Sequence, residues 1–112
     1  MPASGMITSD RLIKENPQFV RRAVRAILKA NRFIDENRQE TIRIMAHFVP
    51  QSPDAAARSY DIELKQLARD GQMTDVEIEF QMDRLAEKKR PLDEIRDFSF
   101  ARQALKELEA GR

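Results

Sequence analysis

The 112-residue sequence contains no cysteine and only one histidine, His47. Without cysteine the chain can form neither a disulfide bond nor a thiolate metal site. The absence does not indicate whether the protein resides in an oxidising or a reducing compartment. His47 has no cysteine or second histidine to share a metal ion with, so we expect it to face solvent on a helix. The sequence therefore predicts no catalytic residue, no metal ligand and no cofactor, and we expect the protein not to be an enzyme.

The sequence also lacks a long apolar run. A membrane-spanning helix needs about 20 apolar residues, so we expect no membrane insertion. Residues 1–6 have neither the basic start nor the apolar core of a secretory signal peptide. The chain would therefore remain cytoplasmic if Met1 is the true start.

Glycine is scarce, with three residues, whereas 41% of the residues are hydrophobic and 35% are charged. This composition favours helix over sheet, and the length indicates one domain. The net charge of +1 hides an asymmetry: residues 1–56 carry +3 and residues 57–112 carry −2. Neither value by itself indicates a polyanionic partner.

The strongest helical pattern runs through residues 16–37. Asn16 suits the N-cap, and Pro17 suits the first helical position, where a missing N–H costs nothing. Apolar residues then recur at helical spacing along one stripe. They are Phe19, Val20, Ala23, Val24, Ile27, Ala30 and Ile34.

A basic group covers much of the rest of this helix. It could contact the phosphates of a nucleic acid. Acidic residues follow it at once, however, and no aromatic or polar base-reading set accompanies it, so we expect a solvated face and no nucleic-acid partner. The group consists of Arg21, Arg22, Arg25, Lys29 and Arg32.

Start and stop signals divide the remaining chain. Ser9 or Thr8 could cap a short helix over residues 10–15. Asn37 and Glu40 have the spacing of a capping box that would start a helix ending at Pro50. One continuous bent helix over residues 17–49 is the alternative.

The second half of the chain repeats such signals. Ser52 precedes a proline and could cap the next helix, which Asp70 and Gly71 would stop, with Gly71 free to take a positive φ. Thr74 and Glu77 form a second capping box, followed by an apolar face that extends up to residue 90. Asp97 or Ser99 would cap a last helix ending at Gly111.

These signals predict an all-α fold of about five helices joined by short turns. Residues 9–112 would form a single helical domain. Residues 1–8 would be a flexible end or the remnant of a strand. Met6, Ile7 and Thr8 could form the end of a β-strand, but the chain offers no second strand to pair with them. The carboxylates of Asp93, Glu94 and Asp97 are interpreted as caps and turn charges, since no nucleophile or metal-ligand pair accompanies them.

Three stretches, taken in order, resemble one known family. They are residues 7–17 (ITSDRLIKENP) continuing into 24–30 (VRAILKA), residues 70–74 (DGQMT) and residues 92–101 (LDEIRDFSFA). Their order and spacing are similar to those in the C-terminal part of periplasmic substrate-binding proteins of ABC importers. The relevant branch includes the aliphatic-sulfonate, nitrate and thiamine-precursor binding proteins.

The family fold has two α/β lobes with the ligand in the cleft between them, and this chain resembles only the last third. The resemblance implies a truncated or excised C-terminal region whose parent binds a small solute, engages an ABC permease and is periplasmic. In such a parent, residues 6–8 would enter a sheet whose other strands lie upstream. No ligand-binding residue of the family can be matched to a position here, so we do not expect this region to bind ligand by itself.

A second interpretation comes from the helices alone. Amphipathic faces that an upstream lobe would cover must be buried elsewhere or left open, and each Å² of buried apolar surface contributes roughly 25 cal/mol. We therefore expect a homo-oligomer formed through exposed apolar helix faces. The alternative function is accordingly a stand-alone helical self-association or interaction module.

Overall fold

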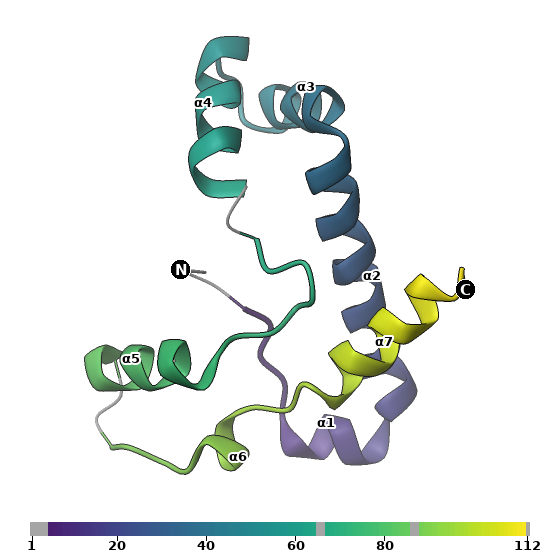
Figure 1. Ribbon diagram of the computed structural model, residues 1–112, viewed down its shortest axis with the longest axis vertical. Helices are drawn as coiled ribbons and strands as arrows, with labels where there is room; N and C mark the ends of the chain where they lie inside the picture. The colour runs from purple at the N-terminus through teal and green to yellow at the C-terminus, as the bar shows by residue number, and fades with distance from the viewer. Residues whose placement is uncertain (1–4, 65–66, 86–87, 112) are drawn as a thin grey trace.

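A computed structural model describes residues 5–64, 67–85 and 88–111. Within these ranges every regular element is a helix, which confirms the predicted all-α class (Figure 1). The five longer helices match the five expected, and the short helix predicted over residues 10–15 is also present. A four-residue helix at residues 92–95 is added. In chain order, the helices of the described residues are α1 (Asp10–Glu15), α2 (Pro17–Glu36), α3 (Arg38–Phe48), α4 (Pro53–Glu63), α5 (Asp75–Leu85), α6 (Leu92–Ile95) and α7 (Ser99–Glu109).

The strand proposed at the N-terminus is absent. Residues 5–9 are neither helix nor strand, and the side chain of Ile7 is 97% exposed. A strand needs a neighbouring strand to pair its backbone groups, and the helices described here supply none. Residues 1–4, which belong to the same predicted segment, lie outside the described residues.

Most of the predicted helix starts are correct. The side chains of Ser9, Asn16 and Ser52 each accept a hydrogen bond from a backbone amide three residues on, at 3.0, 3.2 and 3.2 Å. At the start of α5 the backbone amide of Glu77 donates to Thr74 Oγ1 (3.2 Å), and that of Thr74 donates to Glu77 Oε2 (2.9 Å). This reciprocal pair is the predicted capping box.

The capping box predicted at Asn37 is wrong. The chain does break there, because α2 ends at Glu36 and α3 begins at Arg38, but Asn37 makes no side-chain cap bond to α3. Its amide nitrogen instead donates to the carbonyl oxygen of Phe33 at 3.0 Å, which satisfies the end of α2. Glu40 is engaged by Arg43 on the same helix rather than by the cap amide.

The helices are arranged around α2 (Figure 1). Helix α7 packs against α2, and α1 contacts it as well. Helices α3 and α4 pair with each other beyond the C-terminal end of α2, whereas α5 and α6 form a separate pair on the other side of the α4–α5 connection. The fold is therefore a central rod with two outlying helix pairs.

The connection between α4 and α5 ties these parts to α2. Asn31 Nδ2 donates to the carbonyl of Ala68 at 3.3 Å, and Arg69 binds Asp35 and Glu36 at 2.6 and 2.8 Å. Gly71 takes the predicted positive φ, +68°, although α4 already ends at Glu63 instead of reaching Asp70 as expected. Residues 65 and 66 lie outside the described residues.

The interior is small for a chain of this length. Among the described residues no large side chain is fully buried; the buried apolar residues are Val20, Leu28, Ala56, Tyr60, Ile78, Ala101 and Ala104. The radius of gyration is 16.1 Å, whereas a globular domain of this length has about 13 Å. The accessible surface is 8726 Å², compared with about 6,300 Å² expected for a folded monomer of 13.0 kDa. The chain thus exposes much more surface than a closed domain of its mass.

Candidate functional site

The single histidine lies where the sequence predicted. His47 is exposed on the last turn of α3, and its ring meets that of Phe48 edge-on with centroids 6.0 Å apart. Within the described ranges no group of three or more His, Cys, Asp or Glu side chains could hold a metal ion. Within the same ranges no helix is both long and apolar enough to cross a membrane.

The basic group on α2 is only partly the solvated face that the sequence predicted. Arg21 forms an ion pair and hydrogen bond with Glu107 of α7, and Arg25 Nη1 lies 3.7 Å from the other carboxylate oxygen. Gln103 Nε2 also donates to Glu107 at 3.3 Å. Glu107 is 6% exposed, whereas the two arginine side chains are 40% and 32% exposed. The cluster therefore holds a buried carboxylate in the α2–α7 interface.

The sequence did not indicate a role for Glu107, because a glutamate near a helix end is normally expected to be a surface charge. Its position did carry a signal: residues 101, 104 and 107 recur every three positions, and all three are buried in α7. Two of the five cations of the basic group are thus used within the fold. Arg22 and Lys29 remain exposed on α2.

The clustered carboxylates near α6 are engaged locally. Asp93 lies 3.8 Å from Arg96, and Glu94 lies 3.7 Å from Arg90. Asp97 accepts hydrogen bonds from the hydroxyl (2.5 Å) and backbone amide (2.9 Å) of Ser99, which lower its pKa. These groups act as turn charges, and they form no paired acid and base. The N-cap of α7 is Phe98, which makes no side-chain cap bond, so the cap predicted at Asp97 or Ser99 is wrong.

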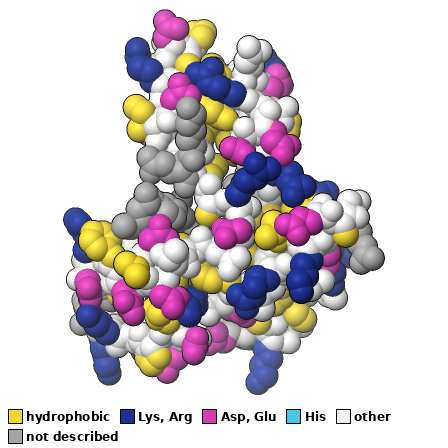
Figure 2. All heavy atoms as spheres, in the orientation of Figure 1, with side chains coloured by type: hydrophobic (Ala, Val, Ile, Leu, Met, Phe, Trp, Pro, Cys, Tyr) yellow, Lys and Arg dark blue, Asp and Glu magenta, His cyan; other side chains and the backbone are white. Residues whose placement is uncertain are grey.

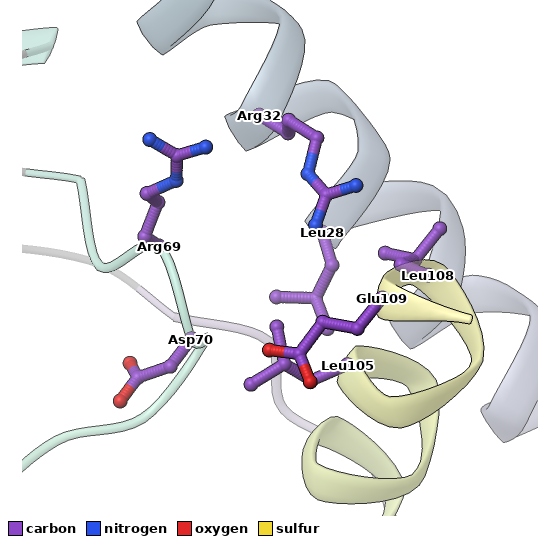
Figure 3. A pocket seen from close by; sticks show the side chains of 7 residues that line it. All are labelled: Leu28, Arg32, Arg69, Asp70, Leu105, Leu108 and Glu109. Atoms are coloured by element: carbon purple, nitrogen blue, oxygen red, sulfur yellow. The ribbon is translucent and has the colours of Figure 1, made fainter. Parts of the chain in front are cut away.

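A hollow of about 300 Å³ lies between α2, the α4–α5 connection and α7. Figure 3 shows side chains of both signs around it, with leucines between them. Its lining residues are Leu28, Arg32, Arg69, Asp70, Leu105, Leu108 and Glu109.

The charges of this hollow do not form a prearranged ligand site. Arg69 is already bound to two carboxylates of α2, and Asp70 accepts from the backbone amide of Gln72 at 3.0 Å. Arg32 and Glu109 have opposite charges and lie on different helices. Because the hollow presents no single charge and no converging set of donors, it favours no particular class of solute.

The exposed side of α2 is the more informative surface. The apolar stripe predicted for this helix is split: Val20 is 7% exposed and packs inward, whereas Phe19 and Ile27 remain 57% and 45% exposed. Leu28, which the predicted stripe omitted, is only 2% exposed. Helix α7 therefore covers one edge of the apolar face of α2 and leaves the other edge open.

Further large apolar side chains are exposed on other helices. Phe48 is 79% exposed at the end of α3, and Val76 and Leu85 are 74% and 79% exposed at the two ends of α5. On the face shown in Figure 2, apolar atoms are interspersed with charges of both signs, and no extended field of one sign is visible. Such a surface suits contact with a protein better than contact with a polyanion.

Comparison of the chain with protein-family models, with curated proteins and with solved structures found no match. The uncovered face of α2 is consequently the feature from which a function can be argued. The side chains of this face are suited to contact with another protein surface, and none of them is positioned to make or break a covalent bond.

Proposed function

We propose that this chain is the C-terminal helical region of a solute-binding protein serving an ABC importer, and that it does not bind solute by itself. The observation that carries the proposal is the excess of accessible surface, about 2,400 Å² above that of a closed monomer of the same mass. In a two-lobed binding protein, the preceding part of the chain would cover such a surface. The ordered resemblance of residues 7–17 with 24–30, 70–74 and 92–101 to that family supports the same assignment.

The N-terminal segment gives further support. Residues 6–8 carry two apolar side chains, of which Met6 is 60% and Ile7 97% exposed. An exposed apolar segment without regular structure, directly before α1, is consistent with a strand separated from the rest of its sheet. Under this proposal the parent protein is periplasmic, captures a small solute and delivers it to an ABC permease.

The proposal is tested by the DNA directly upstream of the Met1 codon. We expect the reading frame to continue upstream, encoding alternating strands and helices behind a signal peptide. The longer product should be monomeric, and its α2 amides should exchange hydrogen much more slowly than those of the 112-residue chain. A stop codon shortly upstream in this frame, with no coding sequence before it, would contradict the proposal.

The alternative is a stand-alone helical module that associates with itself. The exposed edge of α2, with Phe19, Ile27 and Phe33 each more than 40% exposed, favours this alternative. It predicts oligomers of defined size whose melting temperature does not change when sulfonates, nitrate or pyrimidines are added. Solute-induced stabilisation would instead favour a binding protein that acts on its own.

A further inference from the structure

The open edge of α2 carries a regular seam. Its residues follow alternating steps of four and three, which is the spacing of the contact positions in a coiled coil. The two phenylalanines at its ends are 57% and 42% exposed, Ala26 and Ala30 are exposed, and Ala23 is half-buried. We call this set the α2 seam: Phe19, Ala23, Ala26, Ala30 and Phe33.

We propose that two copies of the 112-residue chain pair through the α2 seam, with their α2 helices antiparallel. The pairing does not rest on the transport role proposed above, because it concerns only the surface that this chain exposes. It commits the open face of α2 to one occupant, a second α2.

The sizes of the seam residues favour a staggered antiparallel register. Three central alanines allow two helix axes to approach closely, and a phenylalanine within the contact needs a small residue opposite it. In the register proposed here this applies to Phe33, because Phe19 lies past the end of the second α2 helix. In one register Phe33 lies opposite the second copy's Ala23, and Ala26 lies opposite its Ala30. Ile27, which is 45% exposed beside the seam, then meets its own copy at the two-fold axis.

Charge selects this register over the others. Arg22, Lys29 and Glu36 flank the seam on one side at seven-residue intervals, and all three are exposed. The register described places Arg22 beside the second copy's Glu36, twice by symmetry, whereas an antiparallel shift of one heptad would place Arg22 beside Lys29. A parallel pair would set these charges against isoleucine and valine.

Two side interactions modify this pairing. Glu36 already binds Arg69 at 2.8 Å, but Asp35 holds the other guanidinium nitrogen at 2.6 Å, so Arg69 stays paired if Glu36 is shared. Lys29 faces its own copy near the two-fold axis. Exposed charges interact weakly in water, and this one repulsion is set against two Arg22–Glu36 attractions of the same exposed kind, so charge still favours the register by a small margin.

The area needed for such a pair is available. A standard interface removes about 800 Å² from each partner. The chain has about 2,400 Å² more accessible surface than a closed monomer of its mass. This excess belongs to the whole chain, with the exposed seam residues contributing to it, and it is larger than one such interface requires. The net charge of +1 does not hold two copies apart.

Cysteine cross-linking tests the register, because the native chain has no thiol. Single variants Ala23→Cys, Ala26→Cys and Ala30→Cys are purified separately, mixed in pairs and oxidised. We expect a disulfide-linked dimer from Ala26→Cys mixed with Ala30→Cys, at least tenfold faster than from the other mixtures. Predominant linkage of Ala26→Cys with Ala23→Cys, or of Ala26→Cys with itself, would overturn the register by indicating the shifted or the parallel arrangement.

A second measurement tests the seam itself. Ala26→Glu places two unpaired carboxylates in the contact and should raise the dimer dissociation constant roughly 100-fold or more. Gln39→Glu, which changes the net charge equally at an exposed site on α3, is the matched control and should leave the constant unchanged. Arg22→Glu should weaken the dimer, and adding Glu36→Arg to it should restore affinity.

Circular dichroism separates loss of pairing from loss of folding, because Ala26 is exposed and glutamate is a good helix former. A helical Ala26→Glu chain that remains dimeric would overturn the proposal. This outcome is independent of the transport proposal, which is tested by the upstream reading frame. Either proposal can therefore fail while the other holds.

Discussion

The buried carboxylate between α2 and α7 gives a prediction in which the size of the stability loss depends on which partner is removed. Glu107 is 6% exposed, whereas Arg21 and Arg25 are 40% and 32% exposed. If Glu107→Gln is made, both arginines can turn to water, so the variant should lose only about 1 kcal/mol, the net value of the altered hydrogen bonds. If Arg21→Met and Arg25→Met are combined, a buried carboxylate remains with Gln103 as its hydrogen-bond donor, and the loss should be about 3 kcal/mol or more.

The triple variant completes this test. Adding Glu107→Gln to the two arginine substitutions removes the uncompensated charge, so stability should return most of the way to that of Glu107→Gln alone. Urea unfolding at neutral pH, followed by far-ultraviolet circular dichroism, measures each free energy of unfolding. A Glu107→Gln variant less stable than the double arginine variant would refute the reasoning, as would a triple variant less stable than the double.

Two further predictions concern the turn and cap that frame α5. Gly71→Ala should cost about 2 kcal/mol of stability, because an L residue is strained at φ +68° and its Cβ would lie 2.7 Å from Cδ2 of the buried Leu28. Gly5→Ala, at an open position, is the matched control. Equal melting temperatures for the two variants would contradict the expectation. Thr74→Ala should remove an N-cap worth about 1 kcal/mol. The amide and hydroxyl of Thr74 lower the pKa of Glu77 in the folded chain. As the pH falls, Glu77 therefore binds its proton in the unfolded chain before it does so in the folded chain. The cap's contribution to stability is complete above about pH 4.3, the ordinary pKa of a glutamate, and declines as the pH falls through the folded-state pKa. Thermal melts from neutral to acid pH should therefore show a smaller acid-induced loss for Thr74→Ala than for the native chain, and parallel curves would contradict this.

Local signals in the sequence predicted most of the helix starts, although they did not predict where α4 ends. A side-chain cap acts within three or four residues, so Ser9, Asn16, Ser52 and Thr74 could be recognised without knowledge of the tertiary fold. Asn37 was misread because its amide can either cap the next helix or donate back to the previous one. Only the geometry of the α2–α3 junction decides between these two hydrogen bonds.

Contacts between distant segments could not be predicted in the same way. The spacing of apolar residues located the amphipathic face of α2, but it did not show that α7 would cover the edge bearing Val20 and Leu28 and leave Phe19 open. The bond between Arg21 and Glu107 joins residues 86 positions apart, and no local pattern links them. The coiled-coil spacing of the α2 seam was present in the sequence, yet its significance depends on knowing that this edge is exposed.

The central structural claim is that the 112-residue chain, taken by itself, covers its open α2 face by pairing with a second copy. Sedimentation equilibrium of the unmodified 112-residue chain, from low micromolar to several hundred micromolar, tests the claim most directly. We predict a mass that rises to twice the 13.0 kDa of one chain and then stays constant. A mass of one chain across the whole range, with full helical content, would contradict it.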